Sequence, residues 1–120
     1  MISERELVPS AGHVPFAVQR VAGGTDPTVA IQGELDLATA PAVSRCVESI
    51  VTQGPTRIVF DFTDVTFMDS SGISVLMRAK HSLPDDGQIV IRQPRSAVRR
   101  VLTITGVDEA LLIDDESNNV

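Results

Sequence analysis

The residues best suited to chemistry lie in the middle of the chain, in the stretch Phe67–Gly72 (FMDSSG). Asp69 supplies a carboxylate and Ser70 and Ser71 supply two adjacent hydroxyls, between an apolar run and a segment with helical periodicity. A single residue of this kind is enough to cap a helix, because its side-chain oxygen accepts hydrogen bonds from free N–H groups. Three such residues in a row are more than one helix cap requires. A hydroxyl at a helix N-terminus also suits a phosphate, since the helix dipole and the free N–H groups attract anions.

Enzymatic and metal chemistry have weaker support. A serine nucleophile needs a general base, and neither His13 nor His81 has a context that places it beside Ser70 or Ser71. DSSG also differs from the G-x-S-x-G elbow of serine hydrolases. The histidines and the single cysteine, Cys46, lack metal-ligand spacing, and no phosphate-binding glycine loop is present. We therefore predict that the chain is not an enzyme and uses no cofactor and no metal.

The amino-acid composition limits the kinds of partner that the chain can bind. The 120 residues carry a net charge of −6, with four Phe and no Tyr or Trp. Scattered basic residues and the lack of aromatic stacking surfaces argue against nucleic-acid binding. The sequence shows no signal peptide and no apolar run long enough to cross a membrane, so we expect neither secretion nor a membrane role, and a cytoplasmic location.

The elements that must position the hexapeptide alternate along the chain. Two runs rich in β-branched residues flank the turn sequence GGTDP, and this pattern predicts a hairpin. Thr39 as an N-cap and Pro41 in the first turn predict that a helix begins there. The expected strands are 16–22, 28–33, 57–62, 88–92 and a short one at 110–113, and the expected helices are a segment from Thr39 to before Gly54, 72–83 and 96–106. This order predicts an α/β domain with a mixed, mostly parallel sheet of four to five strands and helices packed on it.

The same reading divides the chain into three parts. Residues 1–15 are expected to form a flexible N-terminal arm, residues 16–114 the domain, and residues 115–120 an acidic tail. Cys46 falls on the apolar stripe of the first helix and is expected to be a buried structural thiol.

The helix after the hexapeptide has an apolar stripe for the core. At about 100° per residue, this stripe consists of Gly72, Val75, Leu76, Ala79 and Leu83. Ile73 and Met77 fall well off it, Ser70 projects beside them, and Ser71 projects onto the opposite flank. An apolar face that the core does not need suits a protein partner. Phosphorylation of Ser70 would add a charge of about −1.5 to −2 to that face.

Four stretches of the chain resemble the STAS domain of the anti-sigma factor antagonist (anti-anti-sigma factor) family. They are Gly33–Thr39 (GELDLAT), Val59–Lys80 with the FMDSSG motif, Gly87–Ile91 and Ala97–Ile113. They follow the family's order and cover most of the chain from about Phe16 onward. The hydroxyl motif after a strand is quite specific, whereas GELD alone is a weak signal.

The resemblance implies partner switching. In this family the unphosphorylated antagonist binds a kinase-type anti-sigma factor and so frees the sigma factor. The anti-sigma factor serine kinase inactivates the antagonist by phosphorylating the hydroxyl after the motif's Asp, and a phosphatase reverses the mark. By this match Ser70 is the phosphoacceptor, Asp69, Ser71 and Gly72 complete the acceptor loop, and Asp36 corresponds to a position at the kinase interface.

Several expectations follow for the partner surface. The partner-binding residues are expected to be Glu34, Asp36, Thr39, Met68, Ile73 and Met77. Asp36 is expected to matter for the partner and little for the fold, the alternative being a turn-stabilising aspartate. The alternative functions are a STAS binding module of another assembly, such as a lipid-transport or stress-signalling complex, and a serine-dependent hydrolase. The sequence indicates no oligomeric state and no role for the N-terminal arm.

Overall fold

The protein forms one five-stranded sheet with helices packed on it. The structure, a computed structural model, describes residues 14–22 and 24–115, so the predicted arm lies almost wholly outside the described residues, as does most of the predicted tail. In chain order the elements are β1 (Ala17–Val21), β2 (Thr28–Leu35), α1 (Ala40–Val51), β3 (Arg57–Met68), α2 (Ser70–His81), β4 (Gln88–Arg92), α3 (Ser96–Ile104), the 3₁₀ helix η2 (Val107–Ala110) and β5 (Leu112–Asp114).

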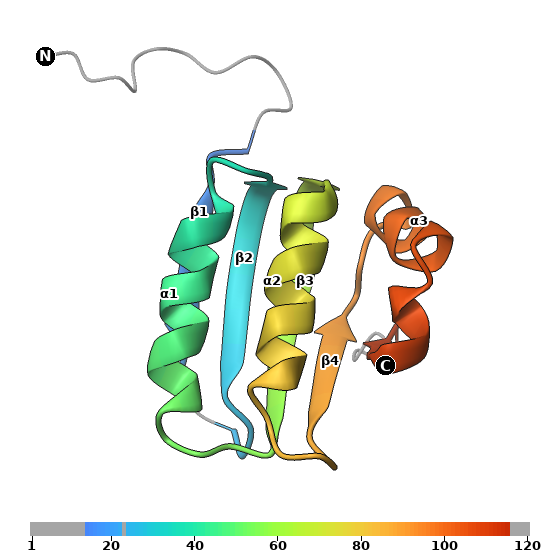
Figure 1. Ribbon diagram of the computed structural model, residues 1–120. Coiled ribbons are helices and arrows are strands. Elements are labelled where there is room, and N and C mark those ends of the chain that lie inside the picture. Colours follow the sequence, from blue (N-terminus) through green and yellow to red (C-terminus); the bar gives the residue numbers. More distant parts are fainter. Residues whose placement is uncertain (1–13, 23, 116–120) are drawn as a thin grey trace, which may run out of the picture.

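The strands follow their sequence order across the sheet, β1-β2-β3-β4-β5. β1 pairs antiparallel with β2, as the predicted hairpin requires, and all later neighbours are parallel. Parallel crossovers are almost always right-handed, so successive crossovers that advance in one direction place their helices on the same face of the sheet. Figure 1 shows α1 and α2 lying across that face. The predicted α/β class and the mixed, mostly parallel sheet are confirmed.

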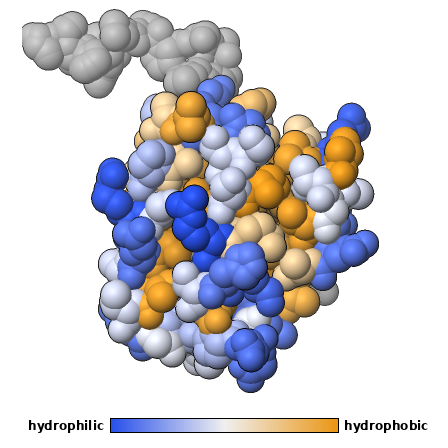
Figure 2. All heavy atoms as spheres, viewed as in Figure 1, coloured by the Kyte–Doolittle hydropathy of each residue, from blue (hydrophilic) through white to orange (hydrophobic). Residues whose placement is uncertain are grey.

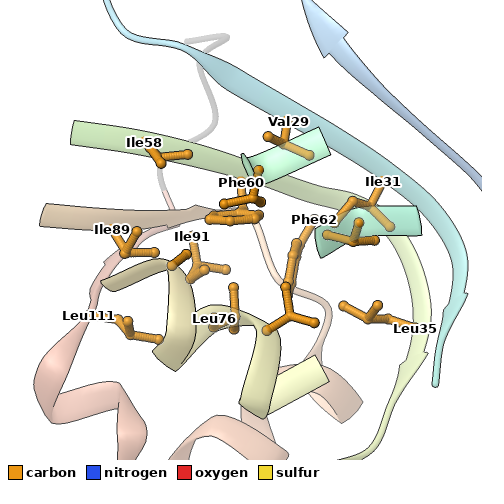
Figure 3. Close-up of a cluster of buried hydrophobic side chains, with 14 of the residues drawn as sticks. Val29, Ile31, Leu35, Ile58, Phe60, Phe62, Leu76, Ile89, Ile91 and Leu111 are labelled. Atoms are coloured by element: carbon orange, nitrogen blue, oxygen red, sulfur yellow. The ribbon is translucent and has the colours of Figure 1, made fainter. Parts of the chain in front are cut away.

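The core lies between the sheet and this helical layer. Phe60 and Phe62 of β3 are fully buried there, and their rings meet edge to face with centroids 6.3 Å apart. Aliphatic side chains from neighbouring strands and from α2 surround them (Figure 3). Because side chains alternate along a strand, this arrangement leaves every second strand residue on the opposite, helix-free face.

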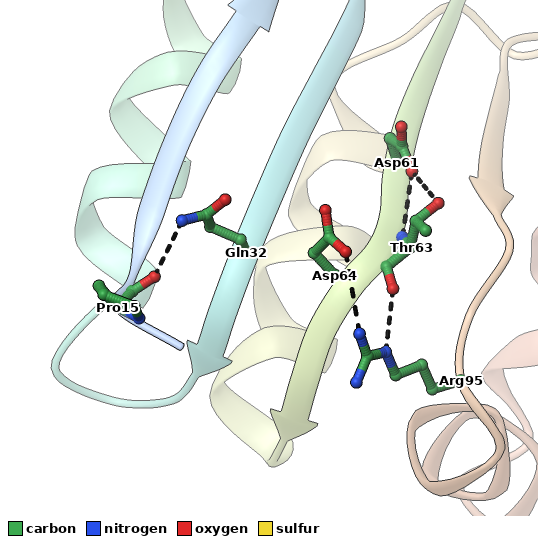
Figure 4. Close-up of polar contacts among 6 residues, drawn as sticks. All are labelled: Pro15, Gln32, Asp61, Thr63, Asp64 and Arg95. Atoms are coloured by element: carbon green, nitrogen blue, oxygen red, sulfur yellow. Dashed lines mark hydrogen bonds and ion pairs between the residues drawn. The ribbon is translucent and has the colours of Figure 1, made fainter. Parts of the chain in front are cut away.

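The helix-free face is largely polar. The Arg95 guanidinium, just after β4, donates to the Thr63 carbonyl at 3.0 Å and lies 3.8 Å from the Asp64 carboxylate. At the other side of the sheet, the Gln32 amide donates to the Pro15 carbonyl at 3.2 Å. Figure 4 shows these contacts on the strands, with helices behind the sheet. They join the loop after β4 to β3 and the start of β1 to β2.

β3 is longer than the sequence pattern predicts. It continues past Phe62 to Met68, and α2 begins at Ser70 instead of Gly72. In the second half of β3 the buried residues Phe62, Val65 and Met68 recur at every third position, because two register shifts (β-bulges) interrupt the pairing with β2. The exposed polar residues between them therefore resemble a loop in the sequence, since no strand alternation is visible there. The final strand is present but lies at Leu112–Asp114.

Candidate phosphoacceptor and partner-binding site

Two loops meet at the carboxyl ends of β2 and β3. The two strands are parallel and pair up to their last residues, with Leu35 opposite Met68. The Asp69 N–H then donates to the Leu35 carbonyl at 3.3 Å. The loop from β2 to α1 and the junction from β3 to α2 therefore lie side by side, although the whole of α1 and β3 separates them in the sequence. This end of the sheet is the candidate site.

At the β3–α2 junction, Asp69 is the N-cap of α2. Its backbone is extended and its carboxylate accepts a hydrogen bond from the Ser71 N–H at 2.8 Å. One of the free N–H groups of the first turn is thereby satisfied. Ser70 is the first residue of the helix and is exposed, whereas Ser71 is half-buried. Of the two hydroxyl residues, Ser70 is thus the more open to an approaching protein.

Gly72 and Met68 have packing roles. A Cβ atom on Gly72 would lie 2.5 Å from Met68 Cγ and 3.0 Å from Leu35 Cδ2, distances at which something must shift. The glycine therefore lets α2 approach the ends of β2 and β3. Met68 is 2% exposed and belongs to the core. The prediction that Met68 contributes to the partner surface is wrong, because the longer β3 turns this side chain inward.

Ile73 and Met77 are half-buried and pack against the core. The expectation that the core does not need their face is therefore wrong in part. Val101 of α3 is half-buried in the same way. Figure 2 shows hydrophobic side chains gathered between α2 and α3 on the helical face. Ile73 and Met77 thus combine support of the core with some accessible apolar surface.

In the β2–α1 loop, Asp36 organises the backbone. Its carboxylate oxygen Oδ1 accepts hydrogen bonds from the Ala38 N–H at 3.0 Å, the Thr39 N–H at 3.1 Å and the Thr39 hydroxyl at 3.2 Å. The Asp36 carbonyl accepts from the Ala40 N–H at 2.8 Å. The expectation that Asp36 matters little for the fold is wrong, and the turn-stabilising alternative describes its contacts.

Thr39 completes this arrangement from the other side. Its hydroxyl donates to the Glu34 carbonyl at 2.8 Å and accepts from the Asp36 N–H at 2.9 Å. Thr39 is the N-cap residue of α1 by position, but its side chain makes no capping hydrogen bond because it turns back into the loop. The predicted capping role is therefore replaced by a reciprocal pair, which we call the Asp36–Thr39 clamp. The Glu34 residue itself is exposed.

The feature that sequence reasoning missed is Leu37. This residue sits within the Asp36–Thr39 clamp and is 78% exposed. At the end of β3, Phe67 is 47% exposed and lies opposite Glu34 in the sheet. The sequence pattern gave no signal for this exposure, because Leu37 continues the alternation of the buried residues Val29, Ile31 and Leu35 of β2. The side chain is exposed because β2 ends at Leu35 and the chain turns into the loop before α1.

The charged side chains of the two segments that form this site are all acidic. Glu34, Asp36 and Asp69 lie in the two segments 34–41 and 67–74, and neither segment contains Lys or Arg. The basic residues of α2 lie in its last turn, at the other end of the helix. A partner that docks at this end therefore meets carboxylates and apolar side chains together.

Cys46 lies away from this site, on α1. It is half-buried against the core, whereas the sequence predicts a buried thiol. Burial raises the pKa of the Cys46 thiol, and the charge of Arg20 opposes this shift with a smaller effect.

Within the described ranges, no group of three or more metal-ligating side chains comes together, and no helix has the length and apolar character needed to cross a membrane.

The fold is that of a known domain class. Residues 18–119 match the family model of the STAS domain. An anti-sigma-B factor antagonist of Listeria monocytogenes is 30% identical over 84 residues, which are 69% of this chain and 74% of that protein. The chain belongs to the STAS-domain family of anti-sigma factor antagonists. Membership in a family of regulatory antagonists agrees with the prediction that the chain is not an enzyme.

Other relatives extend this result. The anti-sigma-F factor antagonist RsfB of Mycobacterium tuberculosis is 28% identical over 81 residues, which cover 68% of this chain and 66% of RsfB, just under two thirds. A crystal structure of an anti-sigma factor antagonist from Mycobacterium paratuberculosis matches with a TM-score of 0.79 at 23% identity, covering 88% of this chain and 90% of that one. The phosphorylated form of the Bacillus cell fate determinant SpoIIAA matches with a TM-score of 0.59 at 26% identity, covering 85% and 93%.

Proposed function

We propose that this protein is an anti-sigma factor antagonist whose unphosphorylated form binds a kinase-type anti-sigma factor and releases the sigma factor. Phosphorylation of Ser70 reverses this state. The observation that carries the proposal is the position of Ser70: it is the exposed first residue of α2, directly after the N-cap Asp69. The Bacillus relative solved in a phosphorylated form supports a phosphate switch in proteins of this fold.

The local charge explains why a phosphate would stop binding. The two segments at this end already carry three carboxylates and no basic side chain. A phosphoserine adds about −1.5 to −2 at neutral pH, which takes the formal charge of the patch from −3 to about −5. Any partner that docks there must remove water from this dianion, and removing the hydration of a charge without a counter-charge costs several kcal/mol. Such a cost lowers affinity by orders of magnitude.

The fold tolerates the same phosphate. A dianion on Ser70 sits at the N-terminal end of α2, where the helix dipole and the free N–H groups stabilise negative charge. The side chain is exposed, so the phosphate displaces no core residue. Phosphorylation is therefore expected to change binding with little change in stability.

The partner surface is proposed around this acceptor. Ile73 and Met77 offer the apolar area next to Ser70 on α2, and Glu34 offers an exposed carboxylate from the neighbouring loop. Asp36 and Thr39 act mainly through the clamp that shapes this loop. A phosphatase that removes the phosphate from Ser70 completes the cycle, and action on a sigma factor would place the protein in the cytoplasm.

The direct experiment is phosphopeptide mapping with purified ATP-binding anti-sigma factors from the source genome. The parent chain should bind one of them and become phosphorylated on Ser70. Ser70→Ala should bind equally well and accept no phosphate, and Ser70→Asp should fold normally but bind at least tenfold more weakly. Ser71→Ala is the matched control and should still be phosphorylated. Phosphate on Ser71 alone, or tight binding of Ser70→Asp, would contradict the proposed switch. Binding to none of these anti-sigma factors would favour a STAS binding module of another assembly.

A further inference from the structure

Leu37 combines exposure with a fixed backbone. Its neighbours Asp36 and Thr39 are tied together by side-chain hydrogen bonds of 2.9 to 3.2 Å, and the Thr39 hydroxyl also holds the Glu34 carbonyl. Yet Leu37 is 78% exposed. Exposed apolar side chains on a surface are common and need no explanation singly. Here a loop built from several specific hydrogen bonds presents the leucine outward at the edge that also carries Ser70, and this combination needs a reason.

We propose that Leu37 is an anchor residue that inserts into an apolar pocket of the anti-sigma kinase, and that lysine or arginine side chains border this pocket. The inference rests on the proposed function and deepens it. A rigid loop loses little conformational freedom on binding, so burial of the leucine contributes to affinity with a small entropic cost. Figure 2 shows hydrophobic surface at the end of the molecule above α1 and β2, where this loop lies.

The charges around Leu37 define the kind of partner. Glu34, Asp36 and Asp69 surround this edge with no Lys or Arg in the same two segments. Complementary partners of such an edge carry positive charge around the apolar contact. A second copy of this chain is a poor occupant, because a two-fold contact would place the same acidic edge on both sides. In this arrangement the basic border faces the carboxylates of Glu34 and Asp36, whereas Ser70 lies beside the apolar residues Ile73 and Met77 of α2. A phosphate on Ser70 therefore loses its hydration against the apolar part of the interface without a counter-charge.

The test measures association and dissociation rates with the purified anti-sigma factor that binds the parent chain. Leu37→Ser should weaken binding on the order of 10- to 100-fold, because it removes the burial of one leucine side chain, and most of the loss should appear as faster dissociation. Leu37→Met should stay within about threefold of the parent, since it preserves apolar volume. The melting temperature of both variants should be unchanged.

Leu112→Ser is the matched control. Leu112 on β5 is 42% exposed. Across the sheet its register continues through Val59 to Thr28, and Thr28 lies seven residues before Leu35 on β2. That separation is roughly 23 Å along the sheet. Its replacement should leave the affinity within twofold of the parent. Equal losses for Leu37→Ser and Leu112→Ser would overturn the inference, as would a Leu37→Ser variant that binds like the parent.

Two further readouts complete the test. Glu34→Gln should slow association and reduce its dependence on NaCl, because the carboxylate faces the basic border. Association that does not respond to NaCl would overturn the basic border.

Leu37→Ser should still be phosphorylated on Ser70 at saturating kinase, since the acceptor is intact. If the parent chain binds no anti-sigma kinase, the proposed function fails and this inference fails with it. If the parent binds and only the Leu37 effect is missing, the inference fails alone.

Discussion

Replacement of Asp36 by alanine should lower stability strongly for a loop residue. The change removes an oxygen that accepts hydrogen bonds from the Ala38 N–H and the Thr39 N–H, while the proton of the Thr39 hydroxyl is donated at shorter distance to the Glu34 carbonyl. A typical hydrogen bond contributes about 0.5–1.5 kcal/mol net, and loss of a capping side chain costs about 0.5–2 kcal/mol. Water can reach part of this loop and solvate the released N–H groups. We therefore expect the free energy of unfolding to fall by about 2 kcal/mol, near the upper end of the range for a lost cap.

Urea unfolding at constant pH is the appropriate assay. The midpoint concentration should fall while the dependence on urea stays constant, because the extent of the folded core does not change. In a thermal scan, a loss of about 2 kcal/mol corresponds to a fall of roughly 6–12 °C for a domain of this size. Asp64→Ala is a suitable comparison. Among the described residues, Asp64 forms an exposed ion pair with Arg95 at 3.8 Å, so its removal should cost less than about 0.5 kcal/mol.

Asp36→Asn separates the two roles of the residue. Asparagine keeps an oxygen that can accept the same N–H groups and removes the negative charge. It should retain most of the stability while binding the anti-sigma kinase more weakly than the parent. The reasoning would be refuted if Asp36→Ala unfolded at the same urea midpoint as the parent, or if asparagine destabilised the protein as much as alanine.

Two further predictions concern packing and the thiol. Gly72→Ala should destabilise the protein by about 1–3 kcal/mol in urea unfolding, because the new methyl group would overlap Met68; a neutral effect would show that α2 can move away. Cys46 should react with a thiol reagent more slowly than an unfolded peptide cysteine at pH 8, and its rate should keep rising at higher pH. The raised pKa leaves less thiolate at any given pH below it, so a rate equal to that of the peptide would contradict the half-buried environment.

The parts of the fold that repeat a period could be predicted from the sequence. α2 shows this well: its core stripe of Val75, Leu76 and Ala79 is buried, and the capping composition located its start to within two residues. The hairpin and β4 are equally well marked by β-branched runs between turns. These features depend on local periodicity and on residues close in the sequence.

The details of the site depend on contacts that no local pattern contains. Met68 is buried because β3 continues through polar residues, which are tolerated only because no helix covers the opposite face of the sheet. The direction of the Thr39 hydroxyl depends on the backbone of the whole loop, and the same residue types fit an ordinary N-cap equally well. The exposure of Leu37 is also not visible in a local pattern, because this residue continues the alternation of the buried residues Ile31 and Leu35 but lies beyond the end of β2.

The packing between the two loops bears on how a phosphate on Ser70 would act. The Asp69 N–H is bonded to the Leu35 carbonyl, and Gly72 lies against both Leu35 and Met68. The acceptor junction is thereby attached to the end of β2, and a phosphate has no loosely held segment to displace at this point. A switch built on such a site works through the charge presented to the partner. The phosphate would add to the negative charge that the carboxylates already present. A partner that binds this surface must therefore accept carboxylates at their fixed positions and reject a bulkier dianion beside its apolar contact.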